Sequence, residues 1–280
     1  MRLHELTIGD TVKDWRSELS FSVAATDHPG YDGIVLVCDN VICCAAFDAA
    51  EPDAGGRFPF DSIDQFGRNN YALSNLHQWL NSGETFWYHP SHDTDTPPIG
   101  KNLRYNEQPN AEANGFLREL TPAFVAAMRE SEVPVLVRTA KERGELETVK
   151  AKVFLPSRTE IGMGDESGFA EGTPLPYFEG RAHLRCAPTK LQMEIYGRAW
   201  NPGFNYGLRE RNLLDGPQTY DPKYVWWWWC RTPHLAYAYL VRVMNANGGF
   251  TYTYANNDIV GIRPMTVMDP DAVLEDGYIV

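Results

Sequence analysis

The sequence predicts an α+β fold, with a mixed sheet, two main helices and long irregular loops. Three observations support this prediction. Residues 1–70 contain β-branched and apolar runs separated by turn signals, which is typical of strands. Two segments with helix start signals follow, before residue 132. Residues 223–268 again have strand character, after a stretch at 162–222 that is rich in Gly, Pro and Asn.

The 280 residues suffice for one large domain, because 43% of them are hydrophobic and 12% are aromatic. The chain shows no internal repeat and no sharp change of composition. We therefore expect a single domain over residues 1–280. Its parts are a strand-rich N-terminal part (1–70), a region of helices and loops (71–222) and an aromatic C-terminal sheet (223–268).

The N-terminal part alternates apolar runs with turn-like sequences. The segments HPGYDG (28–33) and DAGGRFPF (53–60) contain the Gly and Pro residues that interrupt strands. The apolar runs predict four strands, at residues 11–15, 19–27, 33–39 and 41–47.

The first helix is expected over residues 74–83. Ser74 is a good N-cap, and Gly83 can close the far end. Leu76 and Leu80 recur at helical spacing, so both would face the core.

The second helix is expected from Thr121, which is a suitable N-cap before Pro122 at the first helical position. Phe124, Val125 and Met128 lie along one face of it.

Two further local signals follow the second helix. Residues 133–155 predict two strands around a charged, Gly-containing turn at 142–145. Ser157 and Glu160 have the spacing of a capping box, which predicts a short helical turn.

The C-terminal part predicts a small sheet with a tight hairpin. The sequence NANGG (245–249) is a strong hairpin turn between two of its strands. The strands are expected at residues 224–232, 236–244, 249–255 and 259–267.

Four consecutive tryptophans occupy the first of these strands. Side chains alternate between the faces of a strand, so Trp226 and Trp228 share one side with Cys230, while Trp227 and Trp229 share the other. A strand that is aromatic on both faces is usually covered on both. We therefore interpret the four tryptophans as structural residues at the centre of the fold.

The hairpin strands carry tyrosines at alternate positions. Phe250, Tyr252 and Tyr254 lie on one face, with Thr251 and Thr253 opposite. Such a face can be core or a binding surface. Rigid rings with a polar tip bury area at a low entropy cost, which suits glycans and protein partners alike.

Five motifs occur in order up to about residue 267: NNYALSNLHQWLNS, AKVFLPSRTEIGM, VWWWWCRTP, YLVRVMNANGGFTYTYA and VGIRPMTVM. They resemble an uncharacterised family common in phages and prophages, whose members carry Trp-Trp-Leu-Arg-Thr-Pro and Gly-Val-Arg-Pro. The chain departs from that pattern at Cys230, where the family has Leu. A cysteine is a tolerable small hydrophobe at such a position.

The C-terminal half of the pattern is also similar to the C-type-lectin and formylglycine-generating-enzyme superfold. The shared features are an aromatic strand followed by Arg-Ser/Thr, a hairpin and a terminal Gly-x-Arg strand. This resemblance implies a C-type-lectin-like mixed sheet, and it supports fold and not activity. It also implies that Arg231 and Arg263 are structural arginines that tie strands or loops together; two unrelated surface arginines are the alternative.

No complete set of catalytic residues is found. The oxidase branch of the superfold binds copper with a close cysteine pair, whereas Cys186 and Cys230 are far apart in the sequence. The segment YHPSHDTD (88–95) could contact a metal through His89, His92, Asp93 and Asp95, or it could be a solvated polar loop. We expect no catalytic residue, no metal site and no cofactor, and therefore a protein that is not an enzyme.

Charge and composition exclude other classes of function. A formal net charge of −12 disfavours binding to a phosphate backbone. The N-terminus lacks an apolar signal region, and no apolar stretch approaches the roughly 20 residues of a membrane span. The five cysteines form no CxxC pair and suit buried thiols. We expect no nucleic-acid partner and no membrane insertion.

The resemblance and these exclusions together predict a virion-associated phage structural protein. It would be made in the host cytoplasm, assembled on the virion with other virion proteins, and form a homo-oligomer. It would act as a receptor-binding protein for a bacterial surface glycan or protein. The predicted contacts are His234, Tyr237, Tyr239, Tyr252, Tyr254, Asn256, Asn257 and Asp258.

Two alternatives remain open. The first is a purely structural capsid or tail decoration protein, in which an oligomer interface covers the aromatic surface. The second is a metal-dependent enzyme at residues 88–95.

Overall fold

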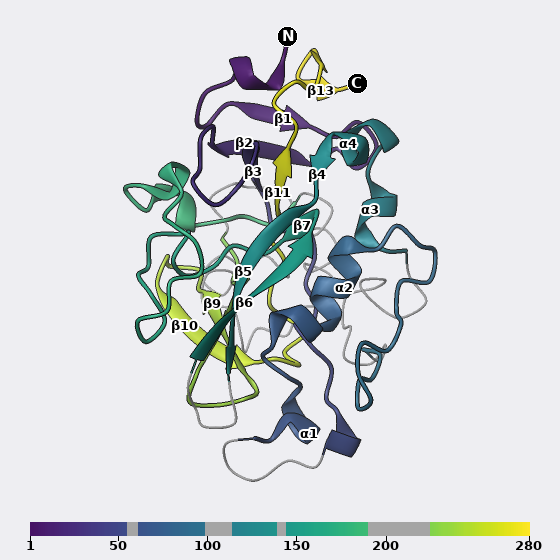
Figure 1. The fold of residues 1–280 in the computed structure, drawn as a ribbon, viewed down its shortest axis with the longest axis vertical. Coiled ribbons are helices and arrows are strands. Elements are labelled where there is room, and N and C mark those ends of the chain that lie inside the picture. The colour runs from purple at the N-terminus through teal and green to yellow at the C-terminus, as the bar shows by residue number, and fades with distance from the viewer. Residues whose placement is uncertain (55–60, 99–113, 139–143, 190–224) are drawn as a thin grey trace, which may run out of the picture.

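The computed structural model describes residues 1–54, 61–98, 114–138, 144–189 and 225–280 (Figure 1). The fold is α+β, as predicted, and its helices are few and short. Among the described residues the α-helices are α1 (Ile63–Phe66), α2 (Asn75–Asn81), α3 (Phe116–Glu119) and α4 (Pro122–Ala127), and the other helices are short 3-10 helices.

The larger sheet is mixed and curled. Neighbouring strands within this sheet pair antiparallel, except that β1 and β13 pair parallel. Strand β7 (Val153–Phe154) also pairs with β11. The strand order is β12 (Leu274–Glu275), β13 (Tyr278–Ile279), β1 (Thr11–Lys13), β2 (Ser20–Ala25), β3 (Ile34–Cys38), β11 (Met265–Met268) and β4 (Met128–Arg129).

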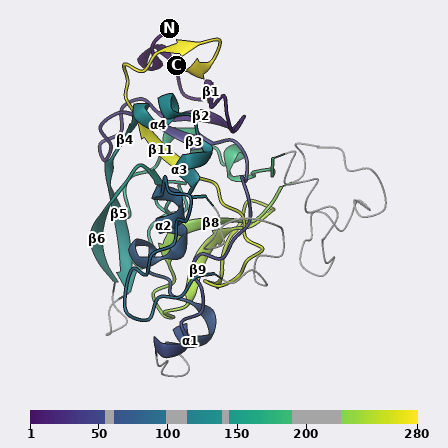
Figure 2. The ribbon, with the colours of Figure 1, turned by 90° about the vertical axis from the view of Figure 1, so that its right-hand side faces the viewer.

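Two smaller sheets complete the described strands. In the three-stranded sheet, β9 (Leu240–Met244) lies between β8 (Trp228–Pro233) and β10 (Phe250–Tyr254). Strands β5 (Ser131–Arg138) and β6 (Gly144–Ala151) form a long hairpin that runs along one side of the molecule (Figure 2). This hairpin confirms the two strands predicted over residues 133–155.

The N-terminus and the C-terminus lie side by side at one end of the molecule (Figure 1). The backbone N–H of Leu3 donates to the carbonyl of Ala272 at 3.0 Å, and that of Leu274 donates to the carbonyl of Met1 at 2.9 Å. Both ends of the chain are therefore held by the larger sheet, while the three-stranded sheet lies further down the molecule.

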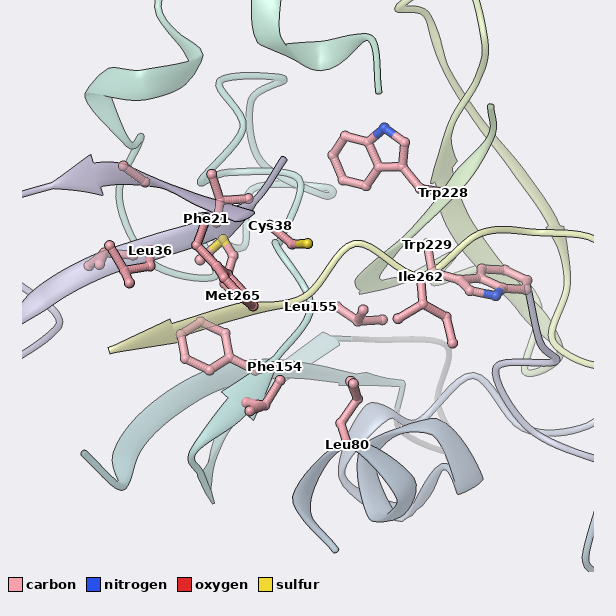
Figure 3. Packing of buried hydrophobic residues seen from close by; sticks show 14 of the residues in the cluster. Phe21, Leu36, Cys38, Leu80, Phe154, Leu155, Trp228, Trp229, Ile262 and Met265 are labelled. Atoms are coloured by element: carbon pink, nitrogen blue, oxygen red, sulfur yellow. The ribbon is translucent and has the colours of Figure 1, made fainter. Parts of the chain in front are cut away.

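The hydrophobic core lies between the larger sheet, α2 and β8 (Figure 3). All five cysteines are buried and none is in a disulfide, as expected of thiols that act as small hydrophobes. The large buried side chains that meet in the core include Phe21, Leu36, Leu80, Phe154, Trp228, Trp229 and Met265.

The capping predictions are confirmed at both helices. The Ser74 side chain accepts a hydrogen bond from the His77 N–H, and the Thr121 side chain accepts one from the Phe124 N–H. Pro122 occupies the first turn of α4, as predicted. Each satisfied N–H removes one of the unpaired donors at a helix start.

The helices are shorter than predicted. Helix α2 ends at Asn81 and its C-cap is Ser82, not Gly83. Helix α4 ends at Ala127, because the next residues pair with β11 as strand β4.

The strand predicted at 41–47 is wrong. The segment is buried and its N–H groups donate to distant carbonyls, for example from Ile42 to Ile262 at 2.9 Å and from Ala45 to Val260 at 3.2 Å. Those contacts form only isolated bridges, so no regular ladder develops. The sequence pattern indicated burial correctly but not regular pairing.

The capping box of Ser157 and Glu160 is confirmed, with reciprocal hydrogen bonds of 2.8 and 3.1 Å. It opens the predicted short helical turn, in which the Ile161 N–H donates to the Ser157 carbonyl at 3.2 Å. Three strand boundaries in the C-terminal part differ from the prediction. Strands β8, β9 and β11 begin later than predicted, at Trp228, Leu240 and Met265.

Candidate binding surface

The β9–β10 hairpin carries most of the predicted contact residues. Its turn is held by Asn245, whose side-chain oxygen accepts the N–H of Gly249 at 2.8 Å. The strands pair in a register that places Tyr252 opposite Arg242 and Tyr254 opposite Leu240. The predicted NANGG turn is therefore confirmed, and it fixes which side chains face one another.

The rings of this region form one continuous surface. We call it the aromatic surface, comprising Phe66, His234, Tyr237, Tyr239, Tyr252 and Tyr254. Its ring centroids are 4.7 Å apart for His234–Tyr252, 5.5 Å for His234–Tyr237, 5.7 Å for Tyr237–Tyr239, 5.9 Å for Tyr239–Tyr254 and 4.3 Å for Phe66–Tyr254.

One end of the aromatic surface is a compact group of three rings. Phe66 also lies 5.2 Å from Tyr239, so each of Phe66, Tyr239 and Tyr254 contacts both of the others. Such tilted and stacked contacts are worth about 0.5–1.5 kcal/mol each beyond the area they bury. The rings are therefore held in place before any ligand arrives.

Two tyrosines of this surface are open to solvent. Tyr252 and Tyr254 are each 47% exposed, while His234, Tyr237 and Tyr239 are half-buried. Among the described residues, the other exposed large aromatic side chains are Trp15 and Phe86, outside this surface.

The segment after α1 holds the loop that carries three of the rings. Asn69 is buried, and its side-chain amide donates to the carbonyl oxygens of Tyr237 at 2.7 Å, Leu240 at 3.0 Å and His234 at 3.2 Å. Its backbone N–H donates to the carbonyl of Ala238 at 2.8 Å. One side chain thus fixes the path of the loop between β8 and β9.

Phe66 reaches the surface through a backbone conformation that requires glycine. Gly67 has φ +76° and ψ 174°, a region that side chains rarely adopt. A Cβ at this position would lie 2.4 Å from the carbonyl oxygen of Asp48. The carbonyl of Phe66 then accepts the N–H of Asn256 at 2.8 Å, which joins α1 to the end of β10.

A charged group borders the aromatic surface beside Tyr252. Arg242 donates to Glu166 through Nε at 2.8 Å and through Nη2 at 2.5 Å, and Arg158 donates to the same carboxylate at 2.7 Å. Burial opposes the ionisation of Glu166, but its hydrogen bonds to the two arginines outweigh this and hold its pKa below the usual value. The guanidinium of Arg242 lies 5.6 Å from the Tyr252 ring centroid.

The last three predicted contacts differ from the rings. The amide of Asn256 donates to the carbonyl of Gln65 at 2.9 Å, and the amide of Asn257 donates to the Thr253 hydroxyl at 2.9 Å. Asp258 is half-buried in the same turn. The two asparagines therefore use their amides to shape the turn after β10.

The tryptophans lie behind this surface, in the core. Trp228 and Trp229 are fully buried, Trp226 is 2% exposed, and Trp227 is half-buried. Since adjacent residues of a strand point to opposite faces, β8 is covered on both sides. The indole N–H groups donate to backbone carbonyls, from Trp226 to Ile259 at 2.9 Å, from Trp228 to Leu184 at 3.1 Å and from Trp229 to Ala45 at 2.8 Å.

Arg231 ties three segments together inside the core. It is fully buried and donates to both carboxylate oxygens of Glu160, at 2.6 and 2.8 Å. It also donates to the carbonyls of Pro134 at 2.9 Å, Leu155 at 2.7 Å and Glu171 at 3.2 Å. Burial opposes its charge, but the charge of Glu160 holds the pKa of Arg231 above its usual value.

Arg263 makes a second buried junction. It is 2% exposed and donates to the carbonyls of Cys38 at 2.9 Å and His183 at 2.7 Å. Its guanidinium also lies 5.3 Å from the Trp228 ring and 5.4 Å from the Phe178 ring. Neither Arg231 nor Arg263 is a surface arginine.

The histidines of the 88–95 loop pair with different carboxylates. His92 lies 3.0 Å from Glu51, and His89 lies 2.8 Å from Glu84. Over the described ranges of the chain, no group of three or more His, Cys, Asp or Glu side chains is placed to hold a metal ion. In the same ranges, no helix is both long enough and apolar enough to span a membrane.

Two residues of the site, Phe66 and Arg242, were not among the contacts predicted from the sequence. Phe66 comes from a short helix with no motif that links it to β10. Arg242 could have been found, because the NANGG turn sets the register that places it opposite Tyr252.

Comparisons with known proteins identify a family for most of the chain. Comparison with curated protein sequences and comparison with solved structures each find no significant match. A family model described as a domain of unknown function (DUF6273) matches residues 53–270, which include every residue of the aromatic surface. The chain therefore belongs to the DUF6273 family.

Proposed function

We propose that the protein acts by binding and not by catalysis, and that the aromatic surface contacts a saccharide of the bacterial cell surface. One observation carries this proposal. Rings from segments far apart in the chain form a continuous surface on which Tyr252 and Tyr254 are each 47% exposed. Tyrosine rings bury the apolar faces of sugars while their hydroxyl groups bond sugar hydroxyls.

A saccharide suits this surface better than a folded protein. A standard protein interface covers about 800 Å² on each partner and has an apolar centre. The exposed aliphatic side chains of the described residues, such as Ile8, Leu146 and Val273, lie outside the segments that build the aromatic surface. The exposed rings there are those of Tyr252 and Tyr254, and both carry a hydroxyl group.

The binding surface would belong to a protein of the phage particle. We propose a virion protein of a phage, made in the host cytoplasm, because its motifs resemble those of phage and prophage proteins. We further propose that its sheet is C-type-lectin-like. The aromatic strand β8, which contains Arg231 and Thr232 after its tryptophans, and the β9–β10 hairpin that follows it support this.

A decoration role is the second candidate, and one observation favours it. Strand β10 is an outer strand of the described three-stranded sheet and carries no charge in its sequence FTYTY. Strand β6, in contrast, carries Glu145, Glu147 and Lys150, and charges of this kind discourage edge pairing. An uncharged edge could pair with a second copy of the chain and cover the tyrosines.

Sedimentation and a binding assay separate the two candidates. Host recognition predicts that the isolated chain binds a bacterial glycan array and that the double variant Tyr252→Ala/Tyr254→Ala loses the signal. The matched control is Trp15→Ala, which removes a ring that is 75% exposed in the turn between β1 and β2. A stable oligomer that binds no saccharide and dissociates in the double variant would support decoration and overturn the binding proposal.

A further inference from the structure

We infer that the saccharide bound at the aromatic surface carries an anionic group, a carboxylate or a phosphate, and that Arg242 receives it. This inference rests on the proposed function and names the chemical class of its ligand. It is carried by the place of Arg242 among the rings and by the balance of charge around it.

Arg242 lies on the same face of the sheet as the exposed tyrosine rings. It is the cross-strand partner of Tyr252, and its guanidinium is 5.6 Å from the centroid of that ring. The same guanidinium is 5.8 Å from the ring of Phe250. A sugar ring stacked on Tyr252 would therefore place its substituents next to this guanidinium.

Among the described residues, Arg242 shares its buried carboxylate partner with a second arginine. Glu166 is the shared acceptor of both Arg242 and Arg158, so two guanidinium groups share one carboxylate. The side chain of Glu166 is only 3% exposed, whereas those of Arg242 and Arg158 are 16% and 26% exposed. The buried carboxylate of Glu166 holds both arginines in place. Of the three side chains, the two arginines are the more exposed to solvent.

The donors of Arg242 are not all used within the described parts of the chain. Glu166 takes Nε and Nη2 there, and no acceptor for Nη1 is found among those residues. A guanidinium that is already oriented loses less freedom when it binds a carboxylate or phosphate oxygen. Arg242 thus offers a fixed donor at the border of the rings.

The positive charge of Arg242 also affects the pKa of the neighbouring His234. The ring of His234 is 4.7 Å from that of Tyr252. Burial and the charge of Arg242 lower the pKa of His234, and Glu166 opposes this with a smaller effect. An anion bound beside Arg242 would raise the pKa of His234, which gives a readout independent of affinity.

The test uses two pairs of probes that differ in charge. Tetragalacturonate is compared with its methyl ester, and a glycerol phosphate oligomer carrying glucose is compared with the uncharged glucosyl glycerol. We expect the wild-type protein to bind the charged member of at least one pair about tenfold more tightly. The pair that shows the difference identifies the anion, and high salt should reduce the difference.

Variants assign the preference to Arg242. Arg242→Gln should bind the charged and neutral probes equally, and Arg242→Lys should keep part of the preference because it keeps the charge. Asp165→Asn, which removes an exposed carboxylate next to Glu166, should strengthen binding of the charged probe. The control is Arg129→Gln, because Arg129 pairs with Asp32 on the larger sheet.

The outcomes distinguish this inference from the proposal beneath it. Equal binding of charged and neutral probes, or equal losses in Arg242→Gln, would overturn the inference and leave saccharide binding intact. An unchanged pKa of His234, measured by NMR with bound charged probe, would also contradict it. Binding of no probe, together with no signal on the glycan array, would overturn both.

Discussion

Phe66 stacks on Tyr254 with ring centroids 4.3 Å apart and an interplanar angle of 16°. This contact joins the short helix α1 to the outer strand β10, which come from distant parts of the sequence. The aromatic surface is therefore a product of the tertiary fold. Residues that brace α1 against the C-terminal sheet should affect binding even though they contact no ligand.

Replacing Asn69 tests this bracing most simply. Asn69→Ala should cost about 1–3 kcal/mol of unfolding free energy, because it removes the hydrogen bonds from a buried amide to the carbonyl oxygens of Tyr237 and Leu240. It should also weaken saccharide binding, since His234 and Tyr237 lose their support. Urea unfolding and calorimetric titration measure the two effects. Gln65→Ala, at an exposed side chain of the same segment, is the control, and equal behaviour of the two variants would argue against the bracing role.

Gly67 should tolerate no side chain. Gly67→Ala combines an unfavourable positive φ with a Cβ placed 2.4 Å from the Asp48 carbonyl oxygen. The matched control is Gly162→Ala, at φ +73° with no atom within 4 Å of the added Cβ. We expect Gly67→Ala to lose about 1–3 kcal/mol more than the control, which is the usual cost of overpacking. Equal unfolding free energies for the two variants would contradict this prediction, because they would mean that the backbone moves to make room for the added Cβ at no cost.

The buried pair of Arg231 and Glu160 should be highly sensitive to the loss of one partner. Glu160→Gln leaves a fully buried guanidinium without its carboxylate, at a cost of about 3–5 kcal/mol. Asp32→Asn removes the fully solvated partner of Arg129 and should cost less than about 1 kcal/mol. Chemical unfolding of both variants checks the contrast. Similar small losses would mean that the buried pair adds little.

Because His77 is buried, we expect the stability of the protein to decrease as the pH falls below 6.5. Burial lowers its pKa from 6.5 to about 4, so the unfolded chain binds more protons between these two pH values. The stability contributed by neutral His77 is therefore complete above pH 6.5 and is lost as the pH falls toward 4. The loss is at most about 3 kcal/mol. The difference between wild type and His77→Gln, followed by unfolding from pH 7 to pH 4, isolates this effect; parallel curves would contradict it.

Local signals in the sequence predicted local structure well. Ser74 and Thr121 cap their helices, and NANGG forms its hairpin, because each depends on contacts between residues close in the chain. The expected burial of the Trp run also holds for Trp228 and Trp229. Hydrophobic alternation along the strand is sufficient to predict that burial.

Features that depend on distant partners could not be predicted in this way. The segment 41–47 has the composition of a strand, but its N–H groups bond carbonyls that form no regular ladder. Asn256 was predicted as a contact residue, whereas a tertiary hydrogen bond to the carbonyl of Gln65 occupies its amide. The contribution of Phe66 follows only from the packing of α1 on β10.

The most direct test is a calorimetric titration of an array-selected saccharide into wild type, Tyr252→Ala/Tyr254→Ala and Trp15→Ala. Two stacking contacts of about 0.5–1.5 kcal/mol each predict that the double variant binds about tenfold more weakly, while Trp15→Ala binds like wild type. An unchanged Kd in a folded double variant would contradict the account.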